Sequence, residues 1–226
     1  MSLFEDYRPA TWAEFIGNDK AVLRVRAIVS RARASGKPFS LWLDGASGTG
    51  KTCAAKLVSR ELGADAFYGI RELDGDKCDK AAVHEIEQSF FGLRPLVGEW
   101  RVVVVNEAHS MTAGAVQSWL TLLEKLPNKC AVLFTTTESW KGEKALFGSF
   151  DHPLQSRATV VSLSNQGLAE AFAKRAQEIA EREGLGGATE KEYLALVRAC
   201  KNNMRAVLSQ IEGYEMHREV AGNVAA

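Results

Sequence analysis

The chain has 226 residues, of which 46% are hydrophobic and 25% charged, and its formal net charge at pH 7 is zero. That length allows one full-sized domain and a smaller one, and the composition is ordinary for a soluble globular protein. The balanced charge argues against strong, autonomous nucleic-acid binding, so any DNA contact needs a local basic patch or neighbouring subunits.

No targeting or membrane segment is apparent in the sequence. No apolar run approaches the roughly 20 residues that span a bilayer, and the N-terminal stretch MSLFEDYRPA lacks the apolar core of a signal peptide. The cysteines form no C-x-x-C pair, which offers neither a zinc site nor an obvious disulfide framework. We therefore expect a cytoplasmic protein without membrane contact.

Strands alternate with helices along the first part of the chain. Apolar runs predict five strands, at 39–45, 66–73, 101–105, 130–137 and 158–164. Apolar residues at helical spacing predict helices at about 20–34, 51–62, 80–91 and 115–126. The run RVVVV is apolar throughout, as expected of a parallel strand buried on both faces. The expected fold class is therefore α/β, with a five-stranded parallel sheet flanked by helices.

The character of the sequence changes after Ser164. The remaining residues are helix-rich, with one break from Gly184 to Gly187. We therefore predict two domains, a base domain at 1–164 and a small all-helical domain at 165–226.

A glycine-rich segment, GASGTGKT, follows the first predicted strand and opens a helix. It matches the P-loop pattern G-x-x-x-x-G-K-[ST] at every position. Its glycines let backbone N–H groups face phosphate oxygens, and the positive end of the helix adds to this attraction. Lys51 brings a charge to the β- and γ-phosphates, and the Thr52 hydroxyl can ligate Mg²⁺. The predicted phosphate-binding set is Gly45, Ala46, Ser47, Gly48, Thr49, Gly50, Lys51, Thr52 and Cys53.

The segment VVVVNEAH, at 102–109, departs from the usual hydrolase pattern. In nucleotide hydrolases an acidic pair at this place holds Mg²⁺ and activates the attacking water. Here the pair is Asn106-Glu107, so Glu107 can still orient or deprotonate water. Asn106 keeps one acceptor oxygen but loses the negative charge and gains two donors. We expect weaker Mg²⁺ retention, partly through water, with nucleotide binding mostly intact; the alternative is that the pair only ends a strand.

Six segments occur in the order that AAA+ ATPases share, namely YRPATWAEFIGN, GASGTGKT, VVVVNEAH, FTTTES, PLQSRATVVSL and NNMRAVLSQIE. Over nearly its whole length the chain resembles the motor subunits of sliding-clamp loaders, such as the small subunits of replication factor C. The resemblance implies a P-loop AAA+ base domain and a helical lid that use ATP and Mg²⁺. It also implies assembly with other AAA+ subunits, a sliding clamp and primed DNA.

The same resemblance implies roles for individual residues. Thr137 corresponds to the sensor 1 residue, with Thr136 as the second choice. Arg157 corresponds to the arginine finger that acts on ATP held by a neighbouring subunit, and Arg205 to the sensor 2 residue that reaches the γ-phosphate. An adenine pocket is implied at Tyr7, Arg8, Pro9, Ile16 and Gly17.

Several features depart from the family pattern. Trp119-Leu120-Thr121 stands where clamp-loader subunits carry arginines that face DNA. The segment from Glu138 to Gln155 is longer than expected, and its aromatic residues either contact a partner or pin the loop. Lysines and arginines between residues 20 and 37 form either a DNA-tracking stripe or a solvated helix face. No counterpart of the third, collar domain is present, which leaves open a shortened chain or a two-domain relative.

Three functions remain open from the sequence. The first is an ATPase subunit of a clamp-loader-like assembly in DNA replication or repair, with slow hydrolysis that depends on assembly. The second is a stator that holds nucleotide without hydrolysing it, which Asn106 favours. The third is another AAA+ DNA motor, acting in branch migration or initiation.

Overall fold

The computed structural model describes residues 2–92, 100–137 and 153–213. Contacts between residues divide the chain into two units. The sheet unit comprises residues 19–46 and 50–163, and the helical unit comprises residues 1–18, 47–49 and 164–226. Because the positions of the two units relative to one another are not determined, each is described by itself.

The sheet unit is built on a five-stranded parallel sheet in the order β2-β3-β4-β1-β5. Its strands are β1 (Phe39–Asp44), β2 (Ile70–Asp74), β3 (Arg101–Asn106), β4 (Cys130–Thr136) and β5 (Thr159–Ser162). The predicted α/β class and its five-stranded parallel sheet are confirmed. Because the strands are parallel, their carboxyl ends meet at one edge, where Asp44 pairs with Thr136 and Asp74 with Asn106.

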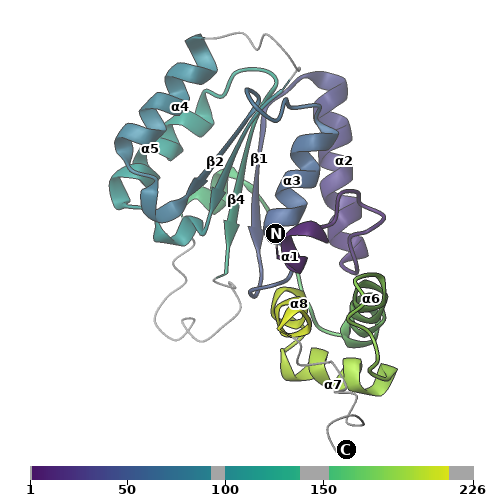
Figure 1. The fold of residues 1–226 in the computed structure, drawn as a ribbon. Coiled ribbons are helices and arrows are strands. Elements are labelled where there is room, and N and C mark those ends of the chain that lie inside the picture. The colour runs from purple at the N-terminus through teal and green to yellow at the C-terminus, as the bar shows by residue number, and fades with distance from the viewer. Residues whose placement is uncertain (1, 93–99, 138–152, 214–226) are drawn as a thin grey trace, which may run out of the picture. The chain divides into compact units, whose positions relative to one another are not determined.

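Helices cover both faces of this sheet. The helices α4 (Lys80–Gly92) and α5 (Ala113–Glu124) lie on one face, and α2 (Asp19–Ser35) and α3 (Lys51–Glu61) lie on the other (Figure 1). Among its described residues the unit also has three short 3-10 helices, η1 (Gly75–Lys77), η2 (Ala108–Ser110) and η4 (Pro153–Arg157). The central strands β3, β4 and β1 are mostly buried because both of their faces are covered, and every residue of β4 is buried. This explains why these strands appear in the sequence as continuous apolar runs.

The strand β2 begins later than the sequence predicts. The expected strand at 66–73 includes a turn, and β2 starts only at Ile70. The side chain of Asp65 accepts hydrogen bonds from the backbone N–H groups of Phe67 (2.9 Å) and Tyr68 (2.8 Å). An aspartate that bonds the backbone two and three residues ahead favours a turn over an extended strand. The strand predicted at 66–69 was therefore wrong, because these residues form a turn before β2.

Trp119 belongs to the core of the sheet unit. Its side chain is fully buried, and its ring meets Phe134 edge-on at a centroid distance of 5.4 Å. Its indole Nε1 donates a hydrogen bond to Cys78 Sγ at 3.3 Å. The sequence comparison placed Trp119 at a position that faces DNA in clamp loaders; here the side chain instead packs α5 against the sheet.

The helical unit is formed by α1 (Leu3–Asp6), α6 (Ala169–Arg182), α7 (Glu190–Ala199) and α8 (Met204–Glu212). Its core joins Leu3 to buried residues of the three longer helices, among them Phe172, Tyr193 and Ile211. A capping box of Thr189 and Glu192 begins α7. The unit encloses an apolar core of its own.

The N-terminal residues associate with the helical unit. The sequence assigned residues 1–18 to the base domain, whereas their contacts are with α6 to α8. Asn18 Nδ2 donates to Ser164 O at 3.0 Å, and Ser164 N donates to Asn18 Oδ1 at 2.8 Å. This reciprocal pair ties residue 18 to residue 164, where the second part of the unit begins.

None of the helices in the described part of the chain combines the length and apolarity that crossing a membrane requires. The aromatic residues Trp140, Phe147 and Phe150, for which a partner contact was considered, lie outside the described residues.

Candidate active site

The P-loop has the backbone conformation that its glycines allow. Gly45, Gly48 and Gly50 have φ angles of +146°, +78° and +91°. Residues with a Cβ rarely adopt these angles, so the three glycines are needed for the loop to turn. The loop follows β1 directly, and α3 begins at Lys51. Anions are attracted to such a helix N-terminus because its first N–H groups have no partner within the helix.

Lys51 lies inside this loop. Its side chain is buried, and its Nζ donates to Gly45 O at 2.8 Å and to Ala46 O at 2.9 Å. A buried ammonium needs partners of this kind, because leaving water without them is costly. Carbonyl oxygens thus hold the charge where the P-loop pattern expects phosphate oxygens.

Asn106 lies at the end of β3, opposite the start of α3. Its Oδ1 accepts hydrogen bonds from Thr52 Oγ1 at 3.2 Å and from Thr135 Oγ1 at 3.3 Å. Its Nδ2 donates to Glu72 Oε1 on β2 at 2.7 Å. The structure therefore brings together Thr52 and Asn106, the two residues that the sequence nominated for the metal, and adds a carboxylate that the sequence did not nominate.

This pair of oxygens fits Mg²⁺ only when a nucleotide completes the site. Among the described residues, no group of three or more His, Cys, Asp or Glu side chains could hold a metal by itself. Mg²⁺ favours oxygen ligands and is commonly bound by one or two protein groups together with substrate phosphates and water. The hydroxyl of Thr52 and the amide oxygen of Asn106 match that arrangement.

Glu107 has a backbone conformation that is rare for its residue type. Its φ and ψ are +49° and +50°, in the left-handed region. Ser110 stabilises this turn, because its N–H donates to Glu107 O at 2.9 Å and its hydroxyl donates to the same oxygen at 2.7 Å. Non-glycine residues in this region are uncommon and cluster at functional sites.

The Glu107 carboxylate is held by the end of β4. Its Oε2 accepts from Thr137 Oγ1 at 2.9 Å and from Thr137 N at 3.2 Å. His109 Nδ1 lies 3.5 Å from the same oxygen and 2.9 Å from the buried Thr136 Oγ1. Of the two threonines considered for sensor 1, Thr137 is therefore the one that bonds Glu107.

Gly75 lies against the turn at Glu107, a contact that the sequence did not reveal. It follows β2, and a Cβ added there would lie 2.3 Å from Glu107 O and 2.6 Å from Ser110 Oγ. Only glycine allows the backbone after β2 to approach the turn at Glu107 this closely. The available signal was a glycine two residues beyond the strand predicted at 66–73.

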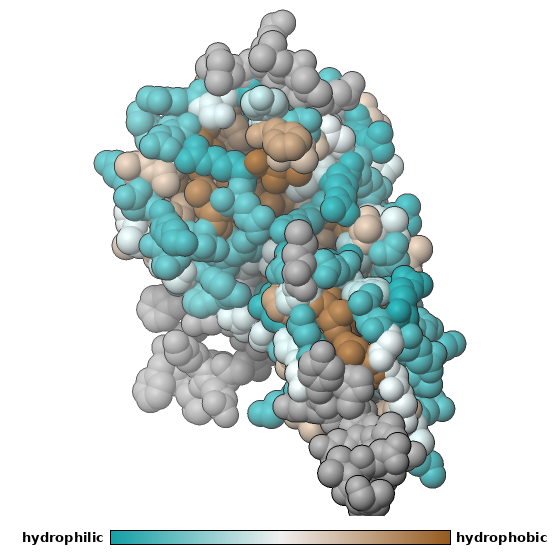
Figure 2. Space-filling view, viewed as in Figure 1, coloured by the Kyte–Doolittle hydropathy of each residue, from teal (hydrophilic) through white to brown (hydrophobic). Residues whose placement is uncertain are grey.

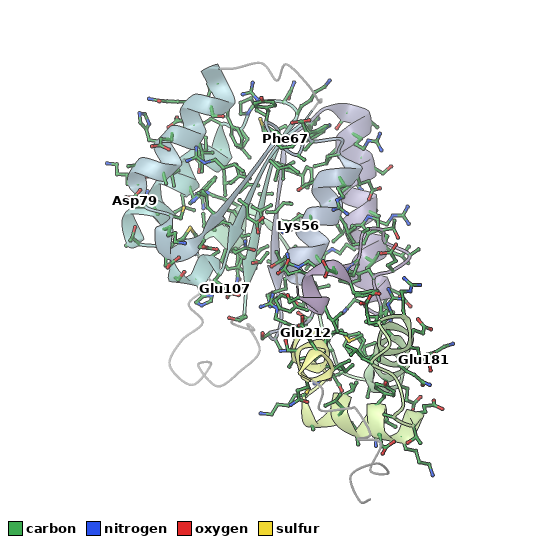
Figure 3. All side chains as sticks on the ribbon, in the orientation of Figure 1. Lys56, Phe67, Asp79, Glu107, Glu181 and Glu212 are labelled. Carbon is green, nitrogen blue, oxygen red and sulfur yellow. The ribbon has the colours of Figure 1, made fainter. Side chains whose placement is uncertain are left out.

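Arg157 lies away from the P-loop of its own chain. Its guanidinium bonds Glu124 Oε1 at the end of α5, through Nη2 at 2.9 Å and Nε at 3.1 Å. Its carbonyl accepts from Ser40 Oγ at 2.7 Å. Ser40 precedes Asp44 on β1 by four residues, or about 13 Å along a strand. The structure thus does not bring Arg157 to Glu107; Figure 3 shows Glu107 at the carboxyl edge of the sheet.

The remaining predicted residues lie in the helical unit. Tyr7 and Ile16 pack against its apolar core, and Gly17, at φ +75°, lies close to Leu168. The Tyr7 hydroxyl donates to Glu183, and this hydrogen bond raises the pKa of the phenol above its ordinary value. Arg8 pairs with Glu5, and Pro9 is partly buried.

Arg205 stands in the first turn of α8. Its backbone N–H donates to Asn203 Oδ1 at 3.1 Å, which caps the helix. Its exposed guanidinium lies 5.4 Å from the ring centroid of Phe4. The P-loop residues Ser47, Gly48 and Thr49 group with this unit by their contacts, and a Cβ at Gly48 would lie 2.2 Å from Asn203 Oδ1.

The fold and these contacts define a class of protein. A parallel sheet with a P-loop after β1, a threonine that opens α3 and a polar pair at the end of β3 is the arrangement of P-loop nucleotide-binding proteins. The chain also matches the model of the ATPase family associated with various cellular activities (AAA) over residues 41–158, just over half of its length. The chain therefore belongs to the AAA family.

Curated relatives point to one branch of that family. The replication factor C small subunit of Archaeoglobus fulgidus is 27% identical over 214 residues, which cover 92% of this chain and 62% of that protein. Replication factor C subunit 4 of Saccharomyces cerevisiae is 26% identical, with 92% and 61% covered. The chain thus spans about three fifths of the length of these relatives.

A solved structure supports the fold alone. The Thermotoga maritima protein named RuvB Holliday junction branch migration motor superposes with a TM-score of 0.64 at 19% identity. The superposition covers 91% of this chain and 64% of that one.

Proposed function

We propose that the chain is an ATP-binding and ATP-hydrolysing AAA+ subunit of a clamp-loader-like assembly that acts in DNA replication or repair. Membership of the AAA family and similarity to replication factor C small subunits support this proposal. The observation that carries it is the pairing of Glu107 with Thr137 beside the pairing of Asn106 with Thr52. One edge of the sheet therefore presents a base for water and ligands for a metal.

In the proposed mechanism each of these groups has one task. Lys51 exchanges its carbonyl partners for the β- and γ-phosphate oxygens, and Thr52 and Asn106 hold Mg²⁺, partly through water. When bound, Mg²⁺ neutralises charge on the phosphates. The Glu107 carboxylate orients the attacking water and accepts its proton, and Thr137 holds that carboxylate in place. The family resemblance assigns two further contacts to residues of the helical unit. The segment from Tyr7 to Gly17 binds the adenine, and Arg205 reaches the γ-phosphate.

The location of Arg157 supports a role in trans. A guanidinium stabilises the charge on a transferring phosphoryl group, but Arg157 is bound to Glu124 far from its own P-loop. It therefore acts on ATP bound by an adjoining AAA+ subunit, which makes turnover depend on assembly. The sliding clamp and primed DNA are proposed partners of that assembly.

The test is ATP turnover as a function of protein concentration, with and without primed DNA, beside Arg157→Ala. We expect specific activity to rise with concentration and to collapse in the variant, and primed DNA to stimulate it. Because ATP binding does not need the finger, the variant should retain it. Turnover that is independent of both concentration and Arg157 would contradict the role in trans.

A second candidate function is a subunit that holds nucleotide without hydrolysing it. One observation favours it, because Asn106 provides no negative charge to the metal. ATP binding without turnover at any concentration, with or without DNA, would support this candidate over the first.

A further inference from the structure

We propose that Glu72, on β2, replaces the charge that Asn106 lacks and fixes the direction of the Asn106 amide toward the metal position. This inference rests on the proposed use of Mg²⁺ and ATP and names a further residue of that site. Glu72 is a positioning residue in this proposal, because it acts through Asn106.

The hydrogen bonds of Asn106 leave one arrangement of its amide that suits all its partners. Nδ2 donates to Glu72 Oε1 at 2.7 Å, while Oδ1 accepts from Thr52 and Thr135. Hydroxyl groups can donate or accept, but a carboxylate only accepts. Turning the amide over would set its oxygen against the Glu72 carboxylate. Glu72 therefore directs Oδ1 toward Thr52, where a metal ligand is needed.

The fold sets these groups opposite one another in pairs. On β2, Glu72 stands two residues before Asp74, which pairs with Asn106 in the sheet, so the Glu72 and Asn106 side chains share a face. On α3, Thr52 and Lys56 are one turn apart and also share a face. Thr52 meets Asn106, and Lys56 Nζ lies 3.5 Å from Glu72 Oε2. Oε1 of Glu72 thus bonds the Asn106 amide, and Oε2 of the same carboxylate faces Lys56.

The expected strength of the effect follows from the location of Glu72. Partners that orient a metal ligand typically contribute roughly 10- to 100-fold to metal affinity. The Glu72 side chain is 39% exposed and faces Lys56, so water and the lysine weaken its field. We therefore expect Glu72 to contribute at the lower end of this range, about tenfold in metal affinity.

The arrangement also predicts that Asn106→Asp alone, which restores the usual aspartate, does not strengthen Mg²⁺ binding. Asn106→Asp would place a second carboxylate where Nδ2 now donates to Glu72, and two carboxylates in such contact cannot both ionise without a large penalty. With Glu72→Gln in the same chain, the glutamine amide can donate to the new aspartate. The double variant should therefore recover the Mg²⁺ binding that each single variant loses.

The experiment measures ATP affinity by calorimetry, in Mg²⁺ and in EDTA, on the full chain. The ratio of the two affinities is the metal enhancement, and it does not require turnover. Glu72→Gln should lower this ratio about tenfold, Asn106→Asp should lower it too, and the double variant should return it to at least the wild-type value. Thermal melts report whether each variant is folded.

Two further variants separate this proposal from a structural role. Glu85→Gln removes an exposed carboxylate that pairs with Arg71 on the other face of the sheet, and it should leave the ratio unchanged. Lys56→Met keeps the Glu72 charge and should not lower the ratio. If Lys56→Met reproduced the loss, Glu72 would act only by pairing with the lysine.

Other results would overturn the proposal directly. An unchanged ratio in Glu72→Gln, or a raised ratio in Asn106→Asp alone, would show that Glu72 does not act on the metal. A wild-type chain that binds no ATP under either condition would instead overturn the proposed function, and this inference with it.

Discussion

The two ends of the sheet serve different purposes. At the amino end, Trp100 is buried and meets Phe39 edge-on at 6.0 Å, and Cys130 is buried at the start of β4. At the carboxyl end, Asn106 accepts hydrogen bonds from Thr52 and Thr135, and Glu107 accepts one from the Thr137 hydroxyl. The strands thus bury aromatic and apolar side chains at one end and carry the proposed site at the other, so variants at the two ends should affect different properties.

The surface near the amino end is apolar as well. Phe67 and Tyr68 are 88% and 80% exposed. Figure 3 labels Phe67 at the end of the sheet opposite Glu107, and apolar side chains gather there among hydrophilic ones in Figure 2.

The largest expected effect is at the carboxyl end, in Glu107→Gln. Gln keeps the size and one acceptor oxygen but cannot take a proton from water. Because general-base catalysis is typically worth about 10²- to 10⁴-fold, steady-state turnover should fall at least about 100-fold. ATP affinity and the free energy of unfolding should remain near wild type, and a variant that fails to bind ATP would show that Glu107 also supports the loop.

Gly75→Ala tests whether the chemistry depends on the close approach of the backbone after β2. The new Cβ would lie 2.3 Å from Glu107 O, and such overpacking typically costs about 1–3 kcal/mol. We expect that loss of unfolding free energy in urea, together with slower turnover, because the turn at Glu107 must shift.

The matched control is Gly114→Ala in α5. Nothing lies within 4 Å of a Cβ at Gly114, and alanine is favoured over glycine in a helix by up to about 1 kcal/mol. This variant should be neutral or slightly stabilising with unchanged turnover. A loss in Gly114→Ala equal to that in Gly75→Ala would contradict the role of close approach.

The amino end should respond to pH through Cys130. Burial raises the pKa of this thiol to about 11, with a small opposing effect of the Arg101 guanidinium. Between pH 9 and 11 the unfolded chain releases a proton that the folded chain retains, so stability is complete below about pH 9 and decreases above it. The free energy of unfolding should fall by about 2 kcal/mol more in wild type than in Cys130→Ala. Parallel curves for the two proteins would contradict the burial effect.

The smallest expected effect is in Glu124→Gln, which releases Arg157. The pair is exposed, so its loss should cost less than about 1 kcal/mol of unfolding free energy. If Arg157 acts in trans, freeing it should lower the protein concentration at which turnover reaches half its maximum. Glu178→Gln, on α6 of the helical unit, removes the same charge and releases Arg175 from an exposed pair, so it serves as the comparison. An unchanged concentration dependence in Glu124→Gln would show that the pair does not restrain the finger.

The sequence predicted those features that depend on local pattern. The P-loop, the apolar strands and their alternation with helices are each set by a few neighbouring residues, and the observed sheet agrees with them. The start of β2 was wrong, because the side chain of Asp65 competes with the strand for backbone donors. The roles of Thr137, Arg157 and Arg205 remain predictions.

The features that the sequence missed depend on contacts between strands that are distant in the chain. Glu72 accepts a hydrogen bond from Asn106, and Gly75 lies against Glu107, in each case across 32 or more positions. Trp119 could not be placed by motif order, because its burial depends on Phe134 and Cys78. An acidic residue in the strand next to an amide-ended strand is a signal worth seeking in other chains.

The left-handed backbone of Glu107 has a consequence for evolution and for engineering. Glycine or asparagine adopts this conformation more readily than glutamate does, so Glu107→Gly should relieve strain while it removes the carboxylate. A screen for heat resistance alone would therefore enrich chains without the carboxylate that the proposed mechanism uses. The proposed role of Glu107 gives a reason for a residue that fits this backbone conformation poorly.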